Sequence, residues 1–319
     1  MWAIPSVARC VVVALPFRYA GLLGPTIIIC PMPTSVSNLR HTDVLELHVA
    51  HACNLTCESC THYSNHGHRG VVSVDDADAW MGAWSSRVAP QRFKLLGGEP
   101  TIHPDLPAFV PLVRKHWPAA TINIATNGFF LHKHPELPAV LAADGHAELS
   151  LSVHHASPEY AARLQPVLDL LSAWQKKHSF TMRINKSADR WTRFYHGYGA
   201  SMQPFQDGRP EESWQVCMTR HSKQLFEAKL WKCPPLAYLK LQKAQFDLSE
   251  QWNRYLEYRP LEPHCSDSEL DAFLAKKGET YCSMCPAEPQ PFSLPLPMRL
   301  PSNTLGASRP DPTTLGQAP

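Results

Sequence analysis

Short apolar runs alternate with amphipathic stretches along the chain from residue 43 onward. The short runs predict strands, and the stretches between them carry apolar residues at helical spacing. Such alternation is typical of βα units around a parallel sheet. The predicted strands cover residues 44–49, 93–96, 121–125, 148–153 and 180–184, and the predicted helices cover residues 74–88, 106–117, 137–143 and 158–177.

Five strand–helix repeats predict an α/β fold. We expect residues 41–205 to form a partial (β/α)6 TIM-like barrel, although the pattern after Lys186 assigns no sixth strand. Residues 224–233 alternate like a small hairpin and helical stretches follow to Lys277, so residues 206–286 are predicted to form a small, separate, cysteine-rich extension. Prolines, serines and threonines without periodicity then predict a disordered tail over residues 287–319.

The first forty residues stand apart from this pattern. Residues 10–30 are apolar, but Arg18, Pro16 and Pro25 interrupt them, which argues against a membrane span. We interpret residues 1–40 as a non-structural leader or a mis-called start, with Met32 as the natural initiator. Cys10 and Cys30 would then carry no function.

The charge and the cysteines of the chain limit its possible binding partners and indicate its cellular compartment. The chain carries 30 basic and 28 acidic residues without a basic run, which indicates neither a nucleic acid nor a membrane partner. Its 10 cysteines are clustered rather than spread, which favours metal binding over disulfides. Thiols must be reduced to bind metal, so we predict a cytoplasmic protein.

A cysteine-rich loop follows the first predicted strand. Cys53, Cys57 and Cys60 (CNLTCESC) sit where the catalytic face of a barrel would lie. Three thiolates on one short loop suit an iron–sulfur cluster and would leave one of four irons open. The alternative is zinc or redox thiols, and a zinc ion would take a fourth ligand from His51, His62 or His66.

This loop resembles the signature of the radical S-adenosylmethionine (radical SAM) superfamily, and the resemblance spans about residues 43–200. Gly97, Gly98 and Glu99 (LLGGEP) match the family motif that receives the methionine amino group. Glycines let backbone approach a ligand closely, and a carboxylate accepts from an ammonium. Further positions that the family uses around the cofactor are Asn127, Ser152 and, for the methionine carboxylate, Arg183.

One position departs from the family pattern. The residue before the third cysteine is often aromatic in the family and is Ser59 here, so Tyr63 becomes the candidate to pack against adenine. The resemblance implies that the open iron of a 4Fe-4S cluster binds S-adenosylmethionine, whose reductive cleavage gives a 5'-deoxyadenosyl radical. It also implies an electron donor of the flavodoxin or ferredoxin type.

Four later cysteines resemble a second family feature. Cys217 and Cys233 (C-x10-A-x4-C), followed by Cys282 and Cys285 (C-x-x-C), are similar to the auxiliary-cluster extension of SPASM and twitch enzymes, with Ala228 at the usual glycine. The resemblance implies one auxiliary iron–sulfur cluster bound by these four thiolates. Structural zinc on the same ligands is the alternative, and Cys265 is left over.

The substrate is the least defined part of the interpretation. His154, His155, Asn185 and Lys186 are candidates to face the barrel mouth. The resemblance implies an oxidoreductase-type reaction, namely oxidation, epimerisation or cross-linking of a peptide or small natural product. A non-catalytic iron–sulfur electron carrier and a zinc-stabilised binding module remain alternatives, which the GGEP motif disfavours because neither needs a methionine site.

Overall fold

The computed structural model describes residues 11–14, 26–29, 39–187 and 191–297. The chain divides into two compact units, residues 1–39 and residues 40–319. In the first unit, β1 (Val11–Ala14) pairs with β2 (Thr26–Ile29) in antiparallel orientation. The predictions for Cys10, Cys30 and Met32 lie outside the described residues. Within the described ranges, no helix is long and apolar enough to cross a membrane.

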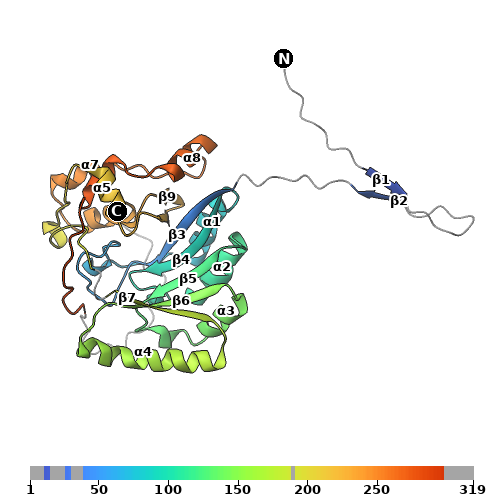
Figure 1. Cartoon of the computed structure of the whole chain (residues 1–319), viewed down its shortest axis with the longest axis horizontal. Coiled ribbons are helices and arrows are strands. Elements are labelled where there is room, and N and C mark those ends of the chain that lie inside the picture. Colours follow the sequence, from blue (N-terminus) through green and yellow to red (C-terminus); the bar gives the residue numbers. More distant parts are fainter. Residues whose placement is uncertain (1–10, 15–25, 30–38, 188–190, 298–319) are drawn as a thin grey trace, which may run out of the picture. The chain divides into compact units, whose positions relative to one another are not determined.

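The second unit is built on a seven-stranded sheet in the order β7-β6-β5-β4-β3-β8-β9 (Figure 1). All neighbouring strands run parallel except β8 and β9. The predicted α/β fold with a mostly parallel, partial barrel sheet is confirmed. The strands are β3 (Arg40–Ala50), β4 (Val88–Gly97), β5 (Thr121–Thr126), β6 (Ala147–Val153), β7 (Thr181–Lys186), β8 (Ser222–Phe226) and β9 (Lys229–Trp231).

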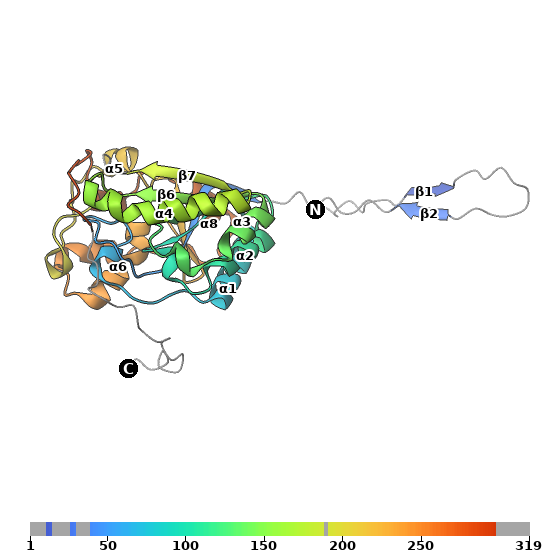
Figure 2. The ribbon, with the colours of Figure 1, turned by 90° about the horizontal axis from the view of Figure 1, so that it is seen from below.

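Helices cover one face of this sheet, and Figure 2 shows the longest of them, α4, running alongside β6 and β7. Alternate strand residues such as Leu45, Phe93 and Leu149 face these helices and are fully buried in the main apolar core. Ser73 begins the first helix by accepting a hydrogen bond from the Asp76 backbone N–H. The covering helices are α1 (Val74–Ser85), α2 (Phe109–His116), α3 (Leu137–Asp144) and α4 (Pro158–Lys177).

The opposite strand positions are polar and largely buried. On β3 and β4, Glu46 accepts a hydrogen bond from Lys94 at 3.0 Å. On β5 and β6, Asn123 donates to Glu148 at 3.1 Å. Buried polar groups need partners, so this inner face is stabilised by hydrogen bonds between neighbouring strands rather than by apolar packing.

The strand beside β3 corrects the predicted domain organisation. Residues 222–231 form the expected hairpin, but β8 pairs in parallel with β3, with Val44 opposite Ser222. The sixth parallel strand is therefore β8, and the hairpin extends the main sheet rather than starting a separate module. The helices around it are α5 (Pro210–Val216), α6 (Pro234–Gln245), α7 (Asn253–Leu256) and α8 (Asp267–Ala275).

The segment after residue 286 also differs from expectation. Leu294 is 6% exposed and packs with Leu55 and Cys57 of the cysteine loop. The Thr56 backbone N–H donates to the Pro297 carbonyl at 2.7 Å. The prediction of a disordered tail is wrong for residues 287–297, because their scattered apolar side chains find a partner on the cysteine loop. Residues 298–319 lie outside the described part of the chain.

Candidate active site

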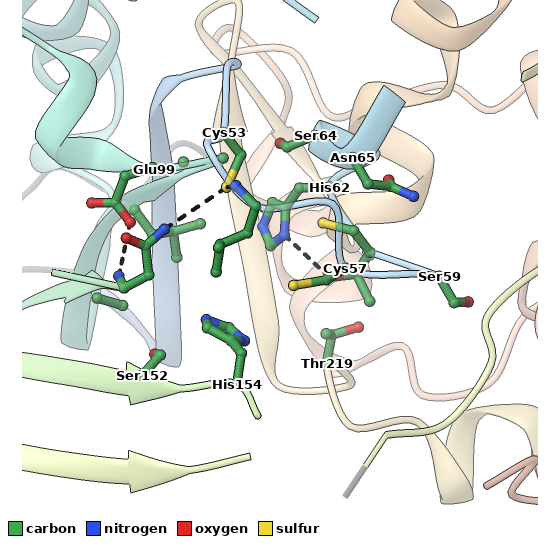
Figure 3. A pocket seen from close by; sticks show the side chains of 18 of the residues that line it. Cys53, Cys57, Ser59, His62, Ser64, Asn65, Glu99, Ser152, His154 and Thr219 are labelled. Atoms are coloured by element: carbon green, nitrogen blue, oxygen red, sulfur yellow. Dashed lines mark hydrogen bonds between the residues drawn. The ribbon is translucent and has the colours of Figure 1, made fainter. Parts of the chain in front are cut away.

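A cavity of about 410 Å³ lies at the carboxyl ends of β3 to β6. The cysteine loop forms one side of it, and the residues after β4, β5 and β6 form the other (Figure 3). Ligand sites in barrel folds lie at this end because the strand–helix loops meet there. Of the predicted site residues, the cavity is lined by Cys53, Cys57, Cys60, Gly97, Gly98, Glu99, Asn127, Ser152 and His154.

The three loop thiols lie in a desolvated environment. Cys57 is 9% exposed, and all eight cysteines of the described residues are free thiols. Burial raises the pKa of Cys57, and the neighbouring Cys60 and Cys53 thiols raise it further. Metal binding is the usual way to hold such buried thiols as thiolates, so the donor set fits an iron–sulfur cluster.

The positions of the side chains alone select neither zinc nor a cluster. Among the described residues, no three Cys, His, Asp or Glu side chains are arranged to hold one metal ion. Of the three histidines considered as a fourth ligand, His62 lines the cavity. His51 contacts the ring of His48 at 2.9 Å between Nδ1 atoms, and His66 contacts the Tyr195 hydroxyl at 3.1 Å.

The GGEP turn docks on the start of the cysteine loop. The Gly98 N–H donates to the Ala50 carbonyl at 2.7 Å, and the Glu99 N–H donates to the Ala52 carbonyl at 2.8 Å. A Cβ atom added at Gly98 would lie 2.3 Å from the Ala52 oxygen. From the sequence, this glycine was expected to allow close approach of a ligand. In the structure, close approach of the protein's own backbone already requires it.

Glu99 ties this turn to the end of β5. Its carboxylate accepts hydrogen bonds from the backbone N–H groups of Thr101 (3.0 Å) and Asn127 (2.8 Å), and from the hydroxyls of Thr101 and Thr126. Burial raises the pKa of Glu99, although these four donors oppose the rise. A methionine ammonium at Glu99 would therefore compete with donors of the protein.

Asn127 connects β5 to the cysteine loop. Its Nδ2 donates to Asn54 Oδ1 at 2.8 Å, and its Oδ1 accepts from the Phe129 N–H at 3.2 Å. The side chain therefore positions the loop beside Cys53, in addition to any contact with a cofactor. The turn asparagine and the cysteine motif, separate in sequence, form one hydrogen-bonded unit.

Ser152 and His154 line the wall opposite the cysteine loop (Figure 3). His154 Nδ1 is buried without a hydrogen-bond partner, and its ring lies 5.6 Å from that of Trp191. Burial lowers the pKa of His154 to about 4, so the imidazole is neutral at neutral pH. A buried polar atom without a partner at a cavity wall is available to a ligand.

Several predicted site residues do not line the cavity. Tyr63 is 1% exposed and packs against Tyr195, with ring centroids 5.3 Å apart. The left-handed backbone at Tyr63 (φ 56°) turns its ring into a second apolar cluster, which also contains Tyr195 and Trp231. Arg183 lies on the edge strand β7, is 59% exposed, and donates to Glu148 at 2.7 Å. Neither residue lines the cavity; nor do the substrate candidates His155, Asn185 and Lys186.

Two charged cavity residues were missed by sequence reasoning. Glu46 and Lys94 line the cavity from the inner face of β3 and β4. The available signal was a charge in the middle of an otherwise apolar strand, since such residues are seldom buried unless paired. His62, considered before only as a zinc ligand, lines the cavity beside them.

The four later cysteines meet at a second, smaller cavity. Cys217, Cys233, Cys282 and Cys285 line a volume of about 30 Å³ together with Lys232 and Arg220. Burial raises the pKa of Cys285, and the three other thiols of the group raise it further. Cys265 lies apart, where its sulfur accepts a hydrogen bond from Arg87 at 3.4 Å.

The departure at Ala228 has a backbone explanation. Glu227 and Ala228 connect β8 to β9 with φ values of 53° and 58°, in the left-handed region that glycine adopts most easily. The Trp84 indole N–H donates to the Ala228 carbonyl at 2.8 Å. Ala228, at the position of the glycine in the C-x(n)-G-x4-C pattern, therefore adopts the left-handed backbone that glycine favours.

Comparison with known proteins supports the site. Residues 47–185 match the Radical SAM superfamily. The probable GTP 3',8-cyclases of Sulfolobus acidocaldarius and Aeropyrum pernix are 28% identical over 119 residues and 32% identical over 124 residues. These matches cover 37% and 36% of this chain, and the chain spans 36% and 33% of those relatives' length.

Among solved structures, that of BtrN in complex with AdoMet and 2-DOIA is similar, with a TM-score of 0.41, 18% identity, and coverage of 68% of this chain and 86% of that one. The superfamily match includes the GGEP turn and the cysteine loop that the fold brings to one cavity. Residues 47–185 therefore carry a domain of the Radical SAM superfamily.

Proposed function

We propose that Cys53, Cys57 and Cys60 bind a 4Fe-4S cluster and that the adjoining cavity binds S-adenosylmethionine and the substrate. The observation that carries this proposal is the gathering of the three thiols, the GGEP turn and Asn127 around one cavity. When bound, the reduced cluster would supply the electron that cleaves S-adenosylmethionine to methionine and a 5'-deoxyadenosyl radical, which abstracts a hydrogen atom from the substrate.

The residues of the chain would position and shield the bound groups. Glu99 holds the turn after β4 against the end of β5, which places Gly97, Gly98 and Asn127 on one wall. Leu55, Trp191 and Phe194 add apolar surface to the cavity, which helps to exclude water from a reactive radical. We expect a flavodoxin or ferredoxin type of electron donor and a cytoplasmic protein.

We further propose that Cys217, Cys233, Cys282 and Cys285 bind an auxiliary iron–sulfur cluster of the twitch type. Their convergence on one small cavity supports a shared metal site, and Lys232 beside them would offset the negative charge of four thiolates. The reaction would be an oxidation, epimerisation or cross-linking of a peptide or small natural product. Structural zinc at these four thiols is the competing outcome.

The test is anaerobic reconstitution with iron and sulfide, followed by metal analysis and a dithionite assay for 5'-deoxyadenosine. Two 4Fe-4S clusters predict about eight irons per chain with product, and Cys285→Ala should lower the iron content to about four. Cys57→Ala should abolish 5'-deoxyadenosine formation. Product formation by Cys57→Ala would refute the assignment of the first cluster, and zinc retained at the later cysteines would refute the auxiliary cluster.

A further inference from the structure

One wall of the cavity carries a cation whose hydrogen-bonding capacity is largely unused. Glu46 on β3 and Lys94 on β4 are paired in register, and Lys94 Nζ lies 3.0 Å from Glu46 Oε1. The Lys94 side chain is 30% exposed, whereas that of Glu46 is 4% exposed. The ammonium therefore reaches the cavity and the carboxylate lies behind it.

Both oxygens of Glu46 already have donors. Oε1 accepts from Lys94, and Oε2 accepts from Gln224 Nε2 at 2.6 Å. Burial raises the pKa of Glu46, but Lys94, His62 and Gln224 together lower it below its ordinary value, so the carboxylate is ionised at neutral pH. Glu46 thus holds Lys94 in place, with one donor on each of its oxygens.

The hydrogen-bond donors at this wall, in contrast, have N–H groups without an acceptor among the described residues of the protein. A lysine ammonium carries three N–H groups, and Glu46 accepts one of those of Lys94. His62 Nε2 is buried without a hydrogen-bond partner, 4.0 Å from Glu46 Oε2. The Thr61 hydroxyl lies 3.1 Å from His62 Nδ1, and when it donates there, the ring proton is on Nε2. Ser222 and Thr219 add hydroxyl groups to the same cavity.

This wall is separate from the GGEP turn. Lys94 precedes Gly98 by four residues along an extended strand, which corresponds to about 13 Å. Lys94 and His62, which both lie beside Glu46, therefore form a part of the wall distinct from the turn. Their free donors match a group rich in acceptors and negative charge.

We propose that Lys94 and His62 bind an anionic group of the substrate, a carboxylate or a phosphate, with Glu46 as the positioning residue for Lys94. This inference rests on the proposed function, because it places the substrate in the same cavity. It narrows the substrate class to acidic peptides, acidic small molecules or phosphate esters. A purely cationic or apolar substrate would leave these donors without an acceptor from the substrate.

The test is thermal unfolding of the reconstituted protein titrated with inorganic phosphate and, separately, with malonate, at ionic strength held constant with chloride. Bound anion stabilises the folded state, so the midpoint rises with concentration. We expect Lys94→Met to weaken the response at least about tenfold, the loss expected for a charge-assisted hydrogen bond. The matched control is Lys115→Met, which removes a lysine paired with Asp78 on the outer helices.

A response to phosphate alone identifies a phosphate site, and a response to malonate alone identifies a carboxylate site. An equal response in the wild type and Lys94→Met, or no response to either anion, overturns the proposal. If Lys94→Met does not fold because Glu46 is left unpaired, the neutral double variant Glu46→Gln with Lys94→Met takes its place in the comparison. Because the readout is unfolding, absence of 5'-deoxyadenosine in the separate assay would refute the proposed function without deciding the anion site.

Discussion

A methyl group added at Gly98 should displace the cysteine loop that forms one side of the cavity. The new Cβ atom would lie 2.3 Å from the Ala52 oxygen, 2.6 Å from its carbonyl carbon and 2.8 Å from the His51 oxygen. All three are backbone atoms, so no side-chain rotation relieves the contact. The cysteine loop would have to move by about 1 Å to restore ordinary van der Waals contact.

The cost follows from the contacts that this movement breaks. Overpacking of a tight site costs about 1–3 kcal/mol. The two hydrogen bonds from Gly98 and Glu99 to the loop would be strained as well, and each contributes about 1 kcal/mol. We therefore expect Gly98→Ala to lower the free energy of unfolding by about 2–4 kcal/mol and to reduce the iron bound at the first cluster.

The assay is anaerobic urea unfolding followed by circular dichroism, with iron analysis after reconstitution. Gly82→Ala is the control, because Gly82 lies in α1 and its added Cβ would meet His116 Cε1 at an ordinary 3.4 Å. An exposed helical glycine replaced by alanine should gain about 0.5–1 kcal/mol. An unchanged unfolding midpoint for Gly98→Ala would refute the packing argument.

Two further predictions concern regions outside the cavity. Ala228→Gly should raise the free energy of unfolding by about 0.5–1 kcal/mol, because it relieves an alanine in left-handed backbone between β8 and β9; a lower urea midpoint would contradict this. Asp144→Asn should cost about 1–3 kcal/mol at pH 7, because Arg114 donates two 2.8 Å hydrogen bonds to the Asp144 carboxylate. Arg114 lowers the pKa of Asp144, so the stabilisation is present above the ordinary carboxyl pKa and is lost as pH falls through the lowered value. The difference between wild type and Asp144→Asn in urea unfolding should therefore shrink as pH falls below about 4, and a difference that stays constant as pH falls would rule out the ion pair as its cause.

The cysteine loop and the strand order up to β7 could be predicted because their signals are local. Spacing within CNLTCESC brings three thiols onto one loop, and alternation of apolar residues over five or six positions identifies each strand. The order of βα units then follows from the rule that consecutive parallel strands lie side by side. The expectation that the GGEP turn and Asn127 lie near the cysteines came from the resemblance to the radical SAM superfamily, and all of them line one cavity.

Only the tertiary structure could show the contacts between residues that are far apart in the sequence. Gln224 reaches Glu46 across 178 residues because β8 pairs with β3, and no pattern within either segment encodes that pairing. The same pairing completes the wall where Lys94 and His62 face the cavity. Tyr63 and the segment 287–297 were misjudged for a related reason, since local composition does not show which surface a side chain will meet. Sequence by itself determined the spacing of the three thiols on one loop, because that spacing is local, and the folded sheet determined which charges surround the cavity beside them, because those charges come from distant strands.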